Sequence, residues 1–183
     1  MSQWRNNMKT LVIYTSQTGF TKKYAELLGS RLNAEVVDLK KVKKAPSSRF
    51  ADADAIIFGG WVIAGKVFGS DWFTPKIAEW QGKKLAMFAV GGFPCEYPET
   101  EAVLQNALTE EQKKHVKVFY CQGGMCFEKM RFPYKLIMKM MRKTAAQNLN
   151  ASEKDKEMAE MLSKSYDSSD AKYIGPIVEY IAG

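Results

Sequence analysis

Residues 12–28 read VIYTSQTGFTKKYAELL, and this stretch decides the fold. It begins within an apolar run, residues 11–14, whose β-branched and aromatic side chains predict a buried strand. Apolar residues then recur at helical spacing and predict an amphipathic helix over residues 20–33, formed around Ala25, Leu27, Leu28 and Leu32. Only a short polar loop separates the two predicted elements, so the chain passes directly from a strand into a helix.

The loop between this strand and helix has the chemistry of a phosphate-binding turn. Ser16, Thr18 and Thr21 offer hydroxyl groups, and Gly19 lets the backbone approach a ligand closely. The first turn of a helix has unpaired N–H groups and a partial positive charge, which suit a dianionic phosphate. The loop lacks an internal lysine and the spacings of P-loops and dinucleotide-binding loops, which argues against nucleotide triphosphates. The alternative is an ordinary helix cap made by serine and threonine side chains.

Residues 12–28 resemble the FMN-binding signature of flavodoxins. The resemblance covers the apolar and aromatic end of the strand, the hydroxyl-rich loop with its small residue, and the first apolar positions of the helix. It implies that loop hydroxyls and amides surround the 5′-phosphate of a noncovalently bound FMN without a basic side chain. The residues that it assigns to this cofactor are Ser16, Gln17, Thr18, Gly19, Phe20 and Thr21.

Further apolar runs predict the rest of a parallel sheet. Strands are expected at residues 11–14, 34–39, 55–60, 84–90 and 116–121, and helices at 20–33, 72–80, 100–114 and 173–182. This alternation predicts an α/β fold class: a three-layer, doubly wound, five-stranded parallel sheet of order 2-1-3-4-5, flavodoxin-like, with a helical insertion after strand five. A receiver domain shares this order, but it needs acidic residues where this chain has hydroxyls and Gly59-Gly60-Trp61.

Two glycine-bearing loops follow the third and fourth predicted strands. In the order 2-1-3-4-5 they lie beside the phosphate loop, at the carboxyl ends of the strands. The resemblance to flavodoxins implies that they hold the isoalloxazine ring, with an aromatic face stacked on it and backbone amides at its polar edge. The residues expected there are Gly60, Trp61, Gly91, Gly92 and Phe93. The alternative is that Trp61 packs under its loop and that Phe93 is a core residue.

No catalytic acid, base or nucleophile is predicted, because the flavin itself would supply the redox chemistry. No metal site is predicted either, since the sequence has no cluster of metal-ligating residues. His115 is the only histidine, and we expect it at the exposed start of a strand. The three cysteines are too sparse for a disulfide scaffold, which favours a cytoplasmic location.

About fifty residues separate the fifth predicted strand from the last helix, far more than a usual connection. We expect residues 125–171 to form a helical insertion in a single domain over residues 1–183, with residues 1–7 flexible. In the first predicted helix of the insertion an apolar face opposes a basic stripe. The apolar face holds Leu136, Ile137, Met138, Met140 and Met141, and the stripe holds Lys135, Lys139, Arg142 and Lys143. A second helix is predicted over 152–164, with Ser152 and Asp155 as a capping pair.

The net charge of +7 favours an anionic partner, whether nucleic acid, a membrane surface or an acidic protein. Of these we expect no nucleic acid. The segment 132–143 is too short to span a bilayer, but it suits peripheral contact with an anionic membrane at the inner face of the cell membrane. The alternative is that its apolar face packs on the domain and leaves the lysines in water.

The insertion also resembles, in position and character, that of the flavodoxin-like, menaquinone-linked protoporphyrinogen oxidases of bacteria. Both have an aromatic and basic lead into a segment like residues 132–143. This resemblance implies an FMN-dependent, quinone-linked enzyme, and a quinone dissolved in the membrane would also explain a basic amphipathic helix. Residues 144–169 show no motif that assigns this activity.

The sequence thus predicts an FMN-binding flavodoxin-like protein that carries out electron transfer, with a redox partner protein or a quinone as its partner. Two alternatives stay open. One is an oxidoreductase of the protoporphyrinogen oxidase type. The other is a flavodoxin-like module that has lost FMN and serves as an interaction domain.

Overall fold

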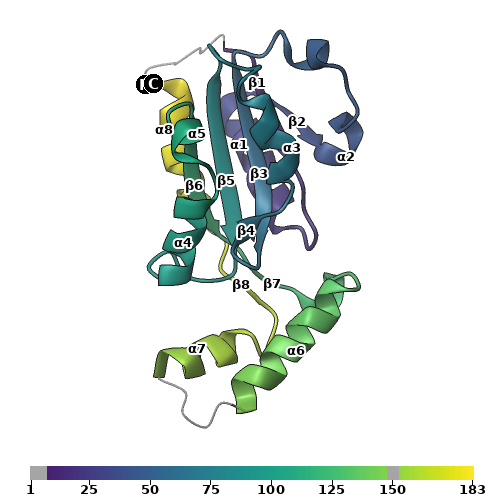
Figure 1. The fold of residues 1–183 in the computed structure, drawn as a ribbon, viewed down its shortest axis with the longest axis vertical. Helices are drawn as coiled ribbons and strands as arrows, with labels where there is room; N and C mark the ends of the chain where they lie inside the picture. Colours follow the sequence, from purple (N-terminus) through teal and green to yellow (C-terminus); the bar gives the residue numbers. More distant parts are fainter. Residues whose placement is uncertain (1–7, 148–152) are drawn as a thin grey trace.

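The computed structural model describes residues 8–147 and 153–183. The predicted flexibility of residues 1–7 and the predicted capping residue Ser152 lie outside the described residues. A parallel sheet forms the centre of the molecule, with the strand order β2-β1-β3-β5-β6 (Figure 1). Its strands are β1 (Thr10–Tyr14), β2 (Glu35–Asp38), β3 (Ala55–Ile63), β5 (Lys84–Gly91) and β6 (Val116–Gln122). This is the predicted order 2-1-3-4-5, since β4 (Lys66–Val67) only pairs with β3 in an antiparallel hairpin.

The central strands are apolar on both faces, as expected for a parallel sheet covered by helices. Neighbouring residues of a strand therefore belong to opposite cores. Leu11 and Ile13 pack into one hydrophobic cluster, while Val12 packs into the other. The same alternation separates Phe58 from Ile57 on β3. The sheet thus divides the interior into two apolar layers and gives the three-layer architecture.

Helices cover the sheet from both sides (Figure 1). One face is covered by α1 (Phe20–Leu32) and α8 (Gly175–Ala182), which follows the 3₁₀ helix η4 (Ala171–Ile174). The other face is covered by α2 (Leu39–Val42), η1 (Ser47–Phe50), α3 (Ser70–Phe73) and α4 (Pro98–Asn106). Aromatic side chains fill this second layer: Phe50, Phe58, Phe73 and Trp80 are almost completely buried.

Two helices predicted as continuous are broken in the structure. In the segment predicted as a helix over 72–80, α3 ends at Phe73 and the 3₁₀ helix η2 (Thr74–Lys76) follows it. The α-helix stops there because Pro75 has no N–H to donate. The segment 100–114 is split into α4 and α5 (Glu110–Lys113). Thr109 starts the second piece through a capping box, in which its Oγ1 accepts from the N–H of Gln112 at 3.3 Å.

The chain between β6 and η4 forms a separate projection beyond the carboxyl end of the sheet (Figure 1). A two-stranded antiparallel ribbon of β7 (Gly124–Met125) and β8 (Tyr166–Asp167) carries it. Between them lie the 3₁₀ helix η3 (Phe127–Lys129) and the helices α6 (Tyr134–Gln147) and α7 (Glu153–Met161). Both predicted helices of this region are present, and the ribbon was not foreseen.

Membrane-spanning helices and groups of metal-ligating side chains are absent from the described residues. Over residues 8–147 and 153–183, every helix is too short or too polar to cross a membrane. Within the same ranges, His, Cys, Asp and Glu side chains do not gather in a group that could hold a metal ion. His115 is exposed and directly precedes β6, as predicted.

Candidate functional site

The phosphate loop predicted from the sequence joins β1 to α1 at the carboxyl edge of the sheet. Its path is fixed by backbone hydrogen bonds, one from the N–H of Thr15 to the carbonyl of Gly59 at 2.9 Å. Gly19 has a φ of 110°, in the left-handed region that favours glycine, and starts α1. Nothing lies within 4 Å of the position that a Cβ of Gly19 would take, so the loop is open on this side.

The loop is not an ordinary side-chain cap. Within residues 8–147 and 153–183, no side chain caps α1. Ser16 Oγ accepts a hydrogen bond from the N–H of Gly19 at 3.1 Å, so its hydroxyl proton is still available to a ligand. The N–H groups of the first turn of α1 have no intrahelical acceptors, as at every helix start. The described residues thus show no ordinary side-chain cap on α1, and the N-terminus of the helix presents donors.

Thr21 has a buried hydroxyl group whose hydrogen-bonding capacity is unused. The residue is 1% exposed, and its Oγ1 has no hydrogen-bond partner among the described residues. Among the described residues it is the only buried side-chain polar atom in this condition. An unsatisfied buried hydroxyl costs about 1–3 kcal/mol, so such groups are rare unless something pairs with them. A phosphate oxygen at the start of α1 fits this hydroxyl.

The two lysines after the loop are directed elsewhere. Lys22 forms an ion pair with Glu26 one turn further along α1, at 3.6 Å. Lys23 contacts the insertion, where its Nζ lies 3.4 Å from Asp167 and 2.6 Å from the hydroxyl of Ser169. The donors that face the loop are therefore neutral hydroxyl and amide groups.

Trp61 lies near the end of β3, where it pairs with Val90 of β5, and its ring belongs to an aromatic cluster. Its ring stacks on that of Phe68, with centroids 4.7 Å apart and planes 23° apart. Tyr134 at the start of α6 meets the Trp61 ring edge-on at 5.0 Å. Gly60 is required for this packing, since a Cβ there would lie 2.4 Å from the carbonyl oxygen of Phe68. Trp61 is thus half-buried and held by both the β3–β4 hairpin and the insertion.

Phe93 lies outside the core, contrary to the alternative considered above. It is half-buried and its ring is nearly parallel to that of Tyr97, with centroids 6.0 Å apart. Its carbonyl accepts a hydrogen bond from the hydroxyl of Tyr120 at 2.7 Å. Both hydrogen bonding and ring packing therefore fix the loop after β5.

The glycines of this loop leave room for two tyrosines. A Cβ on Gly91 would lie 2.4 Å from the hydroxyl of Tyr120, and one on Gly92 would lie 2.7 Å from that of Tyr166. The hydroxyl of Tyr166 donates a hydrogen bond to the carbonyl oxygen of Gly92 at 2.9 Å. Burial raises the pKa of Tyr166 to about 12, so its hydroxyl remains a donor at physiological pH.

The predicted site residues therefore lie along one edge. The phosphate-loop residues follow β1, Gly60 and Trp61 lie at the end of β3, and Gly91, Gly92 and Phe93 lie at the end of β5. The three strands are adjacent, and Tyr14 pairs with Gly59 while Trp61 pairs with Val90. Phe68, Tyr120, Tyr134 and Tyr166 were missed by sequence reasoning. No sequence signal marks them, because Phe68 meets Trp61 only when the hairpin forms and the three tyrosines reach the site from distant segments.

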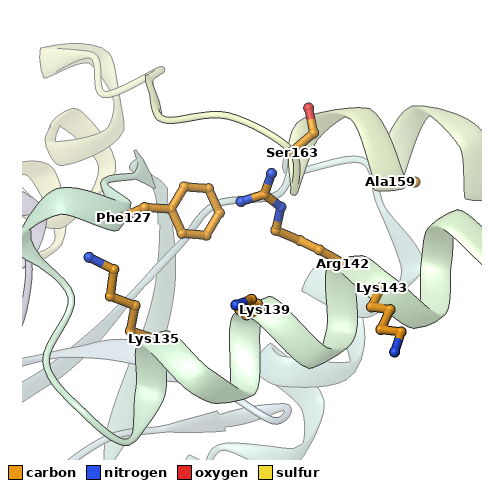
Figure 2. Close-up of a pocket in the computed structure, with 7 residues that line it drawn as sticks. All are labelled: Phe127, Lys135, Lys139, Arg142, Lys143, Ala159 and Ser163. Atoms are coloured by element: carbon orange, nitrogen blue, oxygen red, sulfur yellow. The ribbon is translucent and has the colours of Figure 1, made fainter.

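Much of the described apolar face of the insertion is exposed. Phe132 is 81% and Met140 63% exposed, and Leu136 and Ile137 are also exposed, whereas Met138 is half-buried. The exposure of Leu136, Ile137 and Met140 argues against the alternative in which this face packs on the domain. The basic side chains of the same helix instead line a cavity between η3, α6 and α7 (Figure 2).

Comparisons with known proteins identify a family for this chain but no curated relative. A family model described as a flavodoxin domain matches residues 11–152. That range contains every predicted site residue and helix α6. A comparison with curated proteins found no match.

Solved structures similar to this chain include three bacterial flavoproteins. A WrbA-like flavodoxin from Agrobacterium tumefaciens is 22% identical, covering 63% of this chain and 83% of that one, with a TM-score of 0.48. Oxidised flavodoxin 2 from Bacillus cereus is 19% identical, with coverages of 62% and 84% and a TM-score of 0.45. A flavoprotein from Lactobacillus acidophilus NCFM, solved in complex with FMN, is 17% identical, with coverages of 63% and 92% and a TM-score of 0.44.

Proposed function

Because the chain belongs to the flavodoxin domain family, we propose that it binds FMN noncovalently at the carboxyl edge of its sheet and transfers electrons. The observation that carries this proposal is the buried, unpartnered hydroxyl of Thr21 in the uncapped first turn of α1. FMN, when bound, supplies one- and two-electron chemistry, and the protein supplies binding, orientation and exclusion of water.

The phosphate would be held without a positively charged side chain. We assign Thr21 and Ser16 as hydroxyl donors, and Gln17, Thr18, Gly19 and Phe20 as the backbone around the phosphate. The partial positive charge at the start of α1 favours a dianion there by about 0.3–1 kcal/mol, and up to about 2 when partly buried. The lysine-free loop agrees with this assignment, since Lys22 and Lys23 are paired elsewhere.

The ring would lie between the loops that follow β3 and β5. We assign Trp61 and Phe93 as its aromatic contacts, and Gly60, Gly91 and Gly92 as the backbone beside it. Phe68 and Tyr134 hold Trp61, and Tyr120 and Tyr166 hold the second loop. Both walls are thus fixed before a ligand arrives, which lowers the entropy cost of binding.

The absorption spectrum of the purified protein tests this function. We expect flavin absorption bands, and after removal of the cofactor we expect added FMN to restore them. A colourless protein that does not take up FMN would leave only the interaction-module alternative. With FMN bound, reduction by a flavodoxin-type partner, such as a ferredoxin reductase, would support a role as a carrier between proteins.

A second candidate function is a quinone-linked oxidoreductase of the protoporphyrinogen oxidase type, and the exposed apolar side of α6 favours it. Leu136 and Met140 lie one turn apart on α6 next to lysines, and Phe132 lies just before the helix; all three are exposed. Such a surface suits an anionic membrane, where a quinone would be available. We propose a cytoplasmic protein in peripheral contact with the inner face of the membrane through residues 132–143.

Two measurements test this candidate. The reduced protein should be reoxidised by menaquinone analogues and should turn over protoporphyrinogen. The double variant Phe132→Ser/Met140→Ser should lose binding to anionic vesicles, while its flavin spectrum stays unchanged. Unchanged vesicle binding would exclude α6 as the contact, and a lack of both quinone reactivity and protoporphyrinogen turnover would leave the carrier function.

A further inference from the structure

The cavity between η3, α6 and α7 is separate from the predicted flavin site. It has a volume of about 470 Å³, within the range of sites for small organic ligands. Figure 2 shows Lys135 and Arg142 extending from α6 toward Phe127 of η3, with Lys139 between them on the helix and Lys143 directed away from Phe127. The remaining lining residues are Ala159 and Ser163.

The cations of this cavity form no ion pair within the part of the chain that the structure describes. Among the described residues, no carboxylate lies within ion-pairing distance of the four basic side chains, which are Lys135, Lys139, Arg142 and Lys143. The described glutamates of α7 are engaged elsewhere. Glu153 pairs with Lys156 at 2.6 Å, Glu160 pairs with Lys164 at 3.4 Å, and Glu157 accepts from the hydroxyl of Tyr97 at 3.0 Å.

Glu128 is likewise occupied. Its carboxylate accepts hydrogen bonds from Ser165 at 2.8 Å and from the thiol of Cys126 at 3.4 Å. Like charges spaced three or four residues apart destabilise a helix, so a bound anion would relieve the repulsion within this basic stripe. Of the described carboxylates, Glu128 is affected by one of these cations: hydrogen bonds lower the pKa of Glu128, and the charge of Lys135 adds to this effect.

The geometry of the lining indicates the kind of anion. The guanidinium of Arg142 lies over the ring of Phe127 at 4.9 Å, which orients it while leaving its N–H groups free to donate. Phe127 is itself fixed by a hydrogen bond from its N–H to Ser165 Oγ at 3.0 Å. The basic residues span about 12 Å of helix at ~1.5 Å per residue, more than a single phosphate covers.

We propose that this cavity binds the phosphomonoester or diphosphate end of an organic ligand, with the apolar part of the ligand against Phe127 and Ala159. A planar guanidinium flanked by lysines matches phosphate oxygens through charge-assisted hydrogen bonds. Ser163 is not a donor in this site, because its hydroxyl already donates to the carbonyl of Glu160 at 2.7 Å. The ligand is either a soluble phosphate ester or a lipid headgroup of the same chemistry.

Two variants with the same change in charge test the site. Lys139→Gln/Arg142→Gln removes two cations from the cavity, and Lys40→Gln/Lys41→Gln removes two exposed cations from α2. Binding of inorganic pyrophosphate, measured by calorimetry, should weaken about tenfold or more in the cavity variant and stay near wild type in the α2 variant. Circular dichroism confirms that both variants are folded, and all four side chains are exposed.

Binding to phosphatidylcholine vesicles with and without phosphatidic acid distinguishes a lipid headgroup from a soluble phosphate ester as the ligand. Pyrophosphate binding that the cavity variant alone loses supports a soluble phosphate ester. If pyrophosphate does not bind, selective loss of binding to phosphatidic acid vesicles in the cavity variant supports a lipid headgroup. Equal loss in both variants, or binding to neither probe, overturns the proposal. None of these results depends on FMN, so the outcome is independent of the proposed electron transfer.

Discussion

The hydroxyl of Tyr166 donates a hydrogen bond to the carbonyl oxygen of Gly92 at 2.9 Å. Tyr166 belongs to β8, the strand that brings the insertion back to the sheet, and Gly92 belongs to the loop that we assign to the flavin ring. The insertion therefore helps to shape the proposed cofactor site as well as projecting from it.

We expect Tyr166→Phe to lower the free energy of unfolding by about 1–2 kcal/mol, because the carbonyl of Gly92 would lose its partner in a half-buried position. FMN affinity should fall as well, since the loop after β5 is less well fixed. Urea unfolding and FMN titration measure the two effects. Tyr180→Phe is the control, since no hydrogen bond from the Tyr180 hydroxyl is seen within the described residues; an equal loss in both variants would contradict the prediction.

Thr21→Val should change stability and binding in opposite directions. Without ligand, the variant should be as stable as the wild type or up to about 1 kcal/mol more stable, because a buried unsatisfied hydroxyl is removed. FMN should bind about tenfold more weakly, through the loss of one hydrogen bond to a charged group. Thermal unfolding of the FMN-free protein and fluorescence titration measure the two quantities.

Thr100→Val provides the contrast. Thr100 is also almost fully buried, but its hydroxyl donates to the carbonyl of Pro94 at 2.9 Å. Its replacement should therefore destabilise the protein by about 1–2 kcal/mol. If Thr21→Val destabilises the FMN-free protein by a similar amount, its hydroxyl has a partner after all and the assignment of Thr21 to the phosphate fails.

Gly60→Ala should be strongly destabilising, by about 1–3 kcal/mol or more. The added methyl group would lie 2.4 Å from the carbonyl oxygen of Phe68 and 2.6 Å from Val67 Cγ1, so the hairpin that holds Trp61 must move. Gly175→Ala is the matched substitution in α8, where nothing apart from its neighbours along the chain lies within 4 Å of the new methyl. It should change the free energy of unfolding by less than about 1 kcal/mol, because the advantage of alanine over glycine in a helix is opposed by crowding of the new methyl against Pro176. Chemical denaturation measures the free energy of unfolding of both variants. Equal changes in the two variants would refute the packing argument.

Asp167 should make stability depend on pH in the acidic range. Partial burial opposes its ionisation, but hydrogen bonds from Ser169 and the charge of Lys23 outweigh this and lower the pKa of Asp167 below its usual 3.8. A carboxyl group with a lowered folded-state pKa stabilises the protein above the unfolded pKa, and this contribution disappears as the pH falls through the folded pKa. Asp167→Asn should therefore be less stable than the wild type at pH 7 and equal to it near about pH 2. A difference that persists in acid would contradict this origin.

Much of the architecture could be predicted from the sequence, because the signals were local. The apolar runs gave the five strands, and their spacing gave the order confirmed by the structure. Errors arose where a single side chain changed the helix path. Pro75 ended α3, and Thr109 began a new helix through its capping box, so two predicted helices became shorter pieces.

The site could be predicted only in part. The residues of the phosphate loop and of the two glycine-bearing loops lie at one edge of the sheet, because the carboxyl ends of neighbouring parallel strands meet there. Their contacts with FMN stay a prediction. The residues that hold these loops, Phe68, Tyr134 and Tyr166, come from the hairpin and the insertion. Such contacts between distant segments leave no periodic or local pattern.

By itself, the sequence determined the alternation of strands and helices, the lysine-free loop at the start of α1 and the two faces of α6, because each depends on neighbouring residues along the chain. Only the tertiary structure decided which side of α6 lies toward the other helices of the insertion. The basic side chains of α6 line a cavity with residues of η3 and α7, while Leu136, Ile137 and Met140 are exposed outside that cavity. The tertiary structure also left Thr21 buried without a partner, since burial depends on what the rest of the chain places around a residue.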